Sequence, residues 1–241
     1  MKFLYADFLI ETMLRAVLAG CMAIALNASA PASAAESPPA DPPLKLVGSW
    51  TLTRGDLDVA NGPPATHRLR LEMVMMRAAG WSSEQILDAT KRAVRILAQC
   101  GIRTTFVELY EFDGPARYRY LATPVSRDLA RRVRPARPAV FFVADTLNQP
   151  AFDAEAIGRG NGQSRPEMID TVWITAGTRD LAIVMAHELA HVLADSGEHS
   201  DLPGNLMREE TTAESTALTA RQCRRVRENG TANGLLQQEK P

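Results

Sequence analysis

Two histidines, His187 and His191, are spaced so that both could bind one metal ion. Side chains four residues apart lie on one face of an α-helix, one turn from each other, so both imidazoles can reach the same Zn²⁺. Glu188 follows the first histidine. From there its carboxylate could take a proton from an activated water molecule and later deliver it to a leaving amine. The HExxH pattern therefore predicts a site that hydrolyses amide bonds.

A pattern with two free positions also occurs by chance in ordinary helices. Here it lies in residues 179–195, RDLAIVMAHELAHVLAD, which are apolar on nearly all sides. Such a segment is typical of a helix in the centre of a domain. Burying two histidines and a glutamate there is costly unless they have a partner, and a metal ion is such a partner. We therefore favour a metal site over a chance match.

Catalytic zinc usually has three protein ligands and an open fourth position, so one more ligand is needed. Residues 186–207, AHELAHVLADSGEHSDLPGNLM, resemble the metzincin clan of zinc peptidases, most of all its matrixin-like members. The clan pattern is HExxHxxGxxH followed by a methionine-bearing turn, and the interval from His199 to Met207 matches the matrixin stretch from the third histidine to Leu-Met. The resemblance implies a zincin-like fold, peptide-bond hydrolysis, His199 as the third zinc ligand and Met207 as the turn methionine.

The spacing before the third histidine departs from the clan pattern. The clan's glycine is replaced by Ala194, and the clan's third-ligand position holds Gly197, two residues before His199. We expect the helix to run about one residue further than in the clan, with Gly197 in the left-handed conformation that turns the chain out of the helix. Several carboxylates nearby remain alternative third ligands: Asp195, Glu198, Asp201, Glu210 and Glu214.

The elements around the metal site follow the order of an α/β domain. Alternating polarity predicts strands within residues 44–55 and 67–76, and β-branched and aromatic residues predict another within 102–112. Two nearly all-apolar runs, PAVFFVADT and DTVWITAG, are typical of strands covered on both faces. We therefore predict an α/β (α+β) zincin-like fold with a twisted mixed sheet, a backing helix, a buried active-site helix and a C-terminal helix.

Two helices outside the HExxH segment have clear start signals. Residues 82–100 show helical apolar spacing behind a cap at Ser82 or Ser83. Near the C-terminus, Thr219 and Gln222 form a capping-box pattern at the start of TARQCRRVREN.

By resemblance, a substrate would lie extended along an edge strand beside the site. Candidate walls are residues 170–177, the GxGxG loop at 158–162 and residues 203–205. The GxGxG run does not open a helix directly after a strand, so we interpret it as a mobile loop rather than a phosphate cradle.

The N-terminal residues 1–34 have the pattern of an export signal. Arg15 precedes the apolar run AVLAGCMAIAL, and Ala32-Ser33-Ala34 offers a cleavage site. Acidic residues before Arg15 are unusual in a signal, so translation could begin at Met13. A lipid anchor at Cys21 is the competing interpretation of LAGC. A Pro-rich linker at 35–44 follows, and we expect a single domain over 45–241.

Removal of the signal leaves two cysteines, Cys100 and Cys223. In an oxidising compartment such a pair favours a disulfide, which would tie the end of an early helix to a late one. The alternative is two buried free thiols.

The composition of the chain adds limits on partners. A length of 241 residues suits one well-cored domain, and a formal net charge of −1 does not favour nucleic acid or an anionic membrane as partner. The apolar run near the N-terminus is too short to span a membrane. We therefore predict an exported bacterial zinc endopeptidase, periplasmic or secreted, that acts on a protein or peptide substrate. The alternatives are a non-catalytic metal-binding or protein-binding domain on a zincin scaffold, and a zinc hydrolase for a non-peptide amide.

Overall fold

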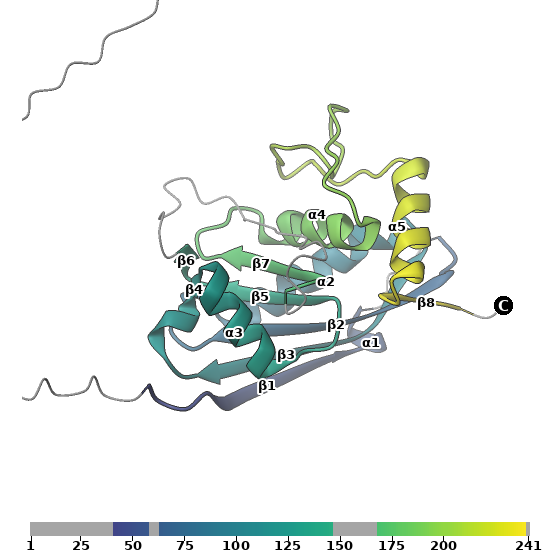
Figure 1. Ribbon diagram of the computed structural model, residues 1–241. Helices are drawn as coiled ribbons and strands as arrows, with labels where there is room; N and C mark the ends of the chain where they lie inside the picture. Colours follow the sequence, from purple (N-terminus) through teal and green to yellow (C-terminus); the bar gives the residue numbers. More distant parts are fainter. Residues whose placement is uncertain (1–40, 58–62, 147–167, 240–241) are drawn as a thin grey trace, which may run out of the picture. The chain divides into compact units, whose positions relative to one another are not determined.

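A twisted mixed sheet forms the centre of the protein, in the strand order β1-β3-β2-β5-β7 (Figure 1). The computed structural model describes residues 41–57, 63–146 and 168–239. The main strands are β1 (Lys45–Thr53), β2 (His67–Met76), β3 (Ile102–Asp113), β5 (Ala139–Val143) and β7 (Thr171–Thr175). β1 runs antiparallel to β3, and the other neighbours in this order are parallel. The predicted mixed sheet is confirmed, whereas the export signal, Cys21 and the GxGxG loop lie outside the described residues.

Shorter elements complete the sheet and its connections. β8 (Leu236–Gln238) pairs antiparallel with the start of β2, and β4 (Tyr120–Leu121) pairs with β6 (Asp145–Thr146) in a separate two-stranded sheet. A short helix α1 (Arg54–Leu57) follows β1, and a 3₁₀ turn (Ala116–Arg119) precedes β4.

Helices α2 (Ser83–Ala98) and α4 (Leu181–Ala194) pack against one face of the sheet. The Ser82 side chain accepts a hydrogen bond from the Gln85 N–H, so the predicted cap of α2 is confirmed. Alternate side chains of β2, β5 and β7 point toward these helices, among them Met73, Val140 and Ile174. Nearly every residue of α4 is buried, as expected for a central helix.

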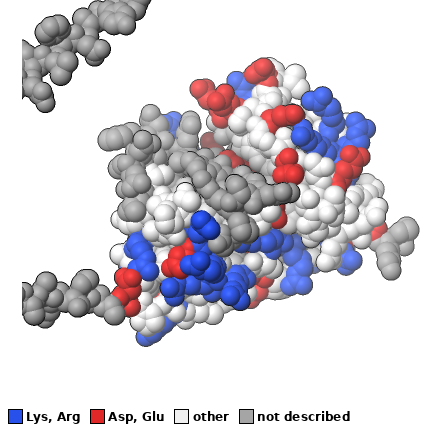
Figure 2. Space-filling model, in the orientation of Figure 1, with Lys and Arg blue, Asp and Glu red and all other residues white. Residues whose placement is uncertain are grey.

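The opposite face of the sheet is covered by α3 (Thr123–Val133), a helix that was not predicted from the sequence. Its Leu129 packs in a cluster with Phe141 and Trp173 of β5 and β7. Figure 2 shows Lys and Arg side chains gathered over this helix. Two of these arginines are bound by one carboxylate, because Asp128 pairs with Arg131 at 2.8 Å and with Arg132 at 3.0 Å. A net charge near zero therefore does not exclude a local group of cations.

Helix α5 (Ala220–Ala232) packs against α4 and begins with the predicted capping box of Thr219 and Gln222. The Cys100–Cys223 disulfide is present and joins the end of α2 to the first turn of α5. The covalent bond therefore fixes α5 beside the two helices that cover the sheet. Within the described part of the chain, no helix is long and apolar enough to cross a membrane.

Candidate metal centre

The HExxH residues lie in the middle of α4, where the helix is enclosed by the core. His187, Glu188 and His191 are 5%, 6% and 9% exposed. Polar groups buried this deeply need partners, and the two imidazoles have them. The predicted placement of these residues on a buried helix is confirmed.

The chain leaves α4 through a left-handed residue at Asp195, with φ 45° and ψ 54°. The prediction that Gly197 takes this conformation is wrong, since its φ is not positive. The helix does continue through Ala194, so the reversal has to occur at the next residue. Aspartate is among the few residues with a side chain that visit this conformation. The Ser196 N–H donates to the carbonyl of His191 at 3.1 Å and closes the turn.

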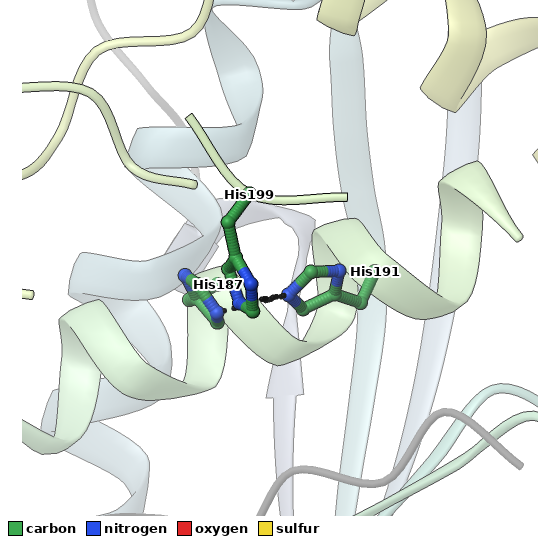
Figure 3. Close-up of side chains that lie close together, drawn as sticks. All are labelled: His187, His191 and His199. Atoms are coloured by element: carbon green, nitrogen blue, oxygen red, sulfur yellow. Dashed lines mark hydrogen bonds between the residues drawn. The ribbon is translucent and has the colours of Figure 1, made fainter. Parts of the chain in front are cut away.

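After this turn, residues 196–200 return over α4 and bring His199 to the other two histidines (Figure 3). The Nε2 atom of His191 lies 3.0 Å from that of His187 and 3.3 Å from that of His199. The ligand atoms of all three side chains lie within 4.8 Å of one another. The structure therefore brings His199, at the longer spacing, into one cluster with the HExxH histidines.

Backbone carbonyls fix the orientation of the two helical imidazoles. His187 Nδ1 lies 2.7 Å from the Leu206 oxygen, and His191 Nδ1 lies 2.6 Å from the Ser196 oxygen. A carbonyl oxygen only accepts hydrogen bonds, so each Nδ1 carries the hydrogen and donates it. In the neutral rings the two Nε2 atoms then face each other with lone pairs. Two lone pairs this close repel each other, and a metal ion bound by both nitrogens would remove that repulsion.

Burial keeps both helical histidines neutral. The pKa of His187 is lowered from 6.5 to about 4, mainly by burial in the core and also by the neighbouring histidines, against the opposing effect of the Leu206 hydrogen bond. Burial also lowers the pKa of His191. Metal ions bind the deprotonated imidazole, so these shifts leave both side chains ready to coordinate at neutral pH.

The geometry of the cluster fits a transition metal. Three imidazoles at about 2.0–2.1 Å from zinc in a tetrahedral arrangement would have nitrogens about 3.3 Å apart. Two of the three separations, 3.0 and 3.3 Å, are close to this spacing, and the ligand atoms of His187 and His199 lie within 4.8 Å of each other. Imidazole also suits copper, iron and nickel, so the donor set is compatible with a metal and does not select zinc.

None of the carboxylates considered as alternative third ligands belongs to the three-histidine cluster found among the described residues. Glu198 forms an ion pair with Arg225 at 2.6 Å, and Glu214 accepts a hydrogen bond from Thr212 at 2.8 Å. The remaining three are exposed: Asp195, Asp201 and Glu210.

A cavity of about 370 Å³ adjoins His199, between the end of α4, the segment after it and the start of α5. Met207, the predicted turn methionine, is 5% exposed and lines this cavity together with His199. The apolar part of the cavity wall includes Ala190, Ala194 and Val226. The predicted wall segments at 170–177 and 203–205 do not line this cavity. Side chains of β7 and of Asn205 are buried instead.

Sequence reasoning missed the groups that orient the ligands. The carbonyls of Ser196 and Leu206 leave no signal in the sequence, because any residue supplies a carbonyl. Asn205 was considered only as a wall residue, yet it is 2% exposed and bonds to Gln222 of the capping box. The sequence signal that could have found it is an asparagine two residues before the predicted turn methionine.

Comparisons with known proteins find similarity among solved structures. No family model matches the sequence, and no curated protein matches it. Among solved structures, the chain is similar to metalloproteinase-II from Bacteroides fragilis, with a TM-score of 0.45 and 17% sequence identity. The similarity covers 70% of this chain and 55% of that one, so the chain spans about half the length of the metalloproteinase.

Proposed function

We propose that the protein is an exported zinc endopeptidase of the metzincin clan, with a matrixin-like site. The observation that carries the proposal is the convergence of three histidine Nε2 atoms, two of them from the buried helix that also carries Glu188. His187, His191 and His199 would hold the metal. Zinc bound there would polarise the scissile carbonyl and lower the pKa of the attacking water.

Glu188 is the proposed general base and then general acid. It follows His187 directly, so its carboxylate stays at the same end of the histidine pair. In this role it removes a proton from the water and transfers the proton to the leaving amine. A protein that only retained metal would have no need for this carboxylate, which favours an enzyme over a non-catalytic zincin scaffold.

The cavity beside His199 supports a substrate with side chains rather than a very small amide. Its volume of about 370 Å³ falls in the range of ligand pockets, and its walls combine apolar residues with polar and charged side chains. We propose that a side chain of a peptide substrate occupies it.

The Cys100–Cys223 disulfide supports an oxidising compartment, periplasmic or extracellular, for the folded chain. Together with the N-terminal pattern, it favours a signal peptide over 1–34, a linker over 35–44 and one peptidase domain over 45–241. Intact-mass measurement of the exported protein would test the boundary after Ala34.

The deciding experiment replaces Glu188 with glutamine. We expect Glu188→Gln to bind zinc within about twofold of wild type while kcat/KM on a mixed peptide library falls by about 10²–10⁴, the usual effect of losing a general base. Glu209→Gln, at an exposed position, is the matched control and should keep full activity. Equal activity of Glu188→Gln and wild type would disprove the catalytic role, and a wild-type protein that binds no transition metal would disprove the metal centre.

A further inference from the structure

The side chains of Asn205 and Gln222 form a reciprocal pair of amide hydrogen bonds beside the metal centre. Asn205 Nδ2 donates to Gln222 Oε1 at 3.0 Å, and Gln222 Nε2 donates to Asn205 Oδ1 at 3.0 Å. Asn205 lies shortly before Met207, and Gln222, 17 positions later, lies in the first turn of α5. Asn205 is almost fully buried, so this pairing satisfies an amide that would otherwise be costly to bury.

Asn205 also holds the peptide unit that follows Leu206. Its Oδ1 accepts a hydrogen bond from the Met207 N–H at 3.0 Å. This N–H and the Leu206 carbonyl belong to the same planar trans peptide, so they point in opposite directions. Fixing the N–H on Asn205 therefore fixes the direction of the carbonyl, and that carbonyl is the acceptor for His187 Nδ1 at 2.7 Å.

Gln222 anchors this arrangement to the rest of the fold. Its Oε1 accepts a hydrogen bond from the Thr219 N–H at 2.8 Å, so the side chain is held by the start of α5. The next residue, Cys223, is bonded to Cys100 at the end of α2. The amide pair thus links α5, which the disulfide holds in place, to the turn that orients His187.

We propose that Asn205 and Gln222 are positioning residues that set the tautomer and direction of the His187 imidazole. Groups that hydrogen-bond a ligand histidine typically change metal affinity by about 10–100-fold when they are removed. Here the acceptor is the Leu206 backbone carbonyl, which no substitution removes. Its direction is fixed by the Asn205 and Gln222 side chains, and these can be substituted. This inference rests on the proposed metal centre, but its first readout does not need a metal.

The first experiment observes the His187 imidazole in the metal-free protein by long-range ¹H–¹⁵N NMR. In wild type we expect one tautomer, with hydrogen on Nδ1. Asn205→Ala and Gln222→Met should each produce a mixture of tautomers at His187 and leave His191 unchanged, because His191 is held by the Ser196 carbonyl. Arg224→Ala is the control, because Arg224 is an exposed residue of the same helix and forms no part of the amide pair.

The second experiment measures the zinc dissociation constant by competition with a chelator. We expect about 10–100-fold weaker binding for Asn205→Ala and less than about threefold for Asn205→Asp, which keeps the acceptor for the Met207 N–H. If Asn205→Ala does not fold, the tautomer and the zinc affinity of Gln222→Met and Asn205→Asp are compared with those of wild type instead. A single unchanged His187 tautomer together with wild-type zinc affinity in both Asn205→Ala and Gln222→Met would overturn the proposal. Wild type that binds no zinc would instead refute the proposed function, and the tautomer experiment would still test the positioning role.

Discussion

The Nε2 atoms of His191 and His199 lie 3.3 Å apart, although eight positions separate the two residues and the helix ends between them. The connection is made by one tight turn at Asp195 and Ser196. Ser196 bonds to His191 twice, since its N–H donates to the His191 carbonyl and its own carbonyl accepts from His191 Nδ1. The turn that ends α4 therefore orients the His191 imidazole and also places His199 beside it.

Replacing His199 with alanine tests whether the third histidine holds the metal. We expect His199→Ala to weaken zinc binding by more than about 100-fold, beyond the usual effect of losing a group that only supports a ligand. Asp201→Ala is the control, because Asp201 is exposed and lies outside the histidine cluster. Chelator competition gives the affinities. Near-stoichiometric zinc in His199→Ala at wild-type affinity would show that another residue is the third ligand.

Substitutions at Asp195 test the helix exit. A residue with a side chain is strained at φ 45°, and a negative charge at a helix C-terminus opposes the helix dipole. We expect Asp195→Gly to raise the free energy of unfolding by about 0.5–1 kcal/mol and Asp195→Val to lower it by about 1–2 kcal/mol. Urea denaturation of the metal-free variants measures both changes. A stabilising valine would contradict the left-handed turn.

The chemistry-bearing part of the fold was predictable because its signals are local. An apolar helix with HExxH, a serine before α2 and the capping box before α5 each depend on residues within one or two turns. The strands β5 and β7 were also predictable, since both are short apolar runs covered on two faces.

What the sequence did not predict depends on longer-range contacts. The three residues of β8 are too few to show a period, and their pairing with β2 is decided by tertiary packing. Helix α3 has apolar residues at helical spacing, Val125, Leu129 and Val133, but its many arginines give the segment a low apolar content, so it was not predicted as a helix. The turn residue was wrongly assigned to Gly197 because glycine is the usual choice, whereas the length of α4 decides which residue must turn.

Removing the disulfide should strongly destabilise the protein. Cys100 and Cys223 are 123 positions apart, and a cross-link that closes a loop of this size is expected to contribute on the order of 5 kcal/mol by restricting the unfolded chain. We expect the Cys100→Ala/Cys223→Ala variant to unfold at much lower urea concentration than wild type. Wild type treated with reductant should match the variant. A difference below about 1 kcal/mol would mean that the unfolded chain gains little freedom when the bond is absent.

Acid should destabilise the metal-free protein between about pH 6.5 and pH 4. Burial lowers the pKa of His187 from 6.5 to about 4, so in this range the unfolded chain binds a proton that the folded protein does not. The free energy of unfolding is therefore highest above pH 6.5 and falls as the pH decreases, by roughly 3 kcal/mol for this one group. The lowered pKa of His191 adds to the same slope.

Urea denaturation of chelator-treated protein at a series of pH values measures this fall in stability. His187→Gln lacks the titrating imidazole, so its stability should decline less steeply over the same range. Parallel curves for the variant and wild type would assign the acid sensitivity to other groups. Zinc competes with protons for the same nitrogens, so zinc-loaded wild type should begin to lose stability only at lower pH than the metal-free protein. Zinc should give no such protection to His199→Ala at the same concentration, because His199 is a proposed ligand whose loss leaves two histidines in the cluster.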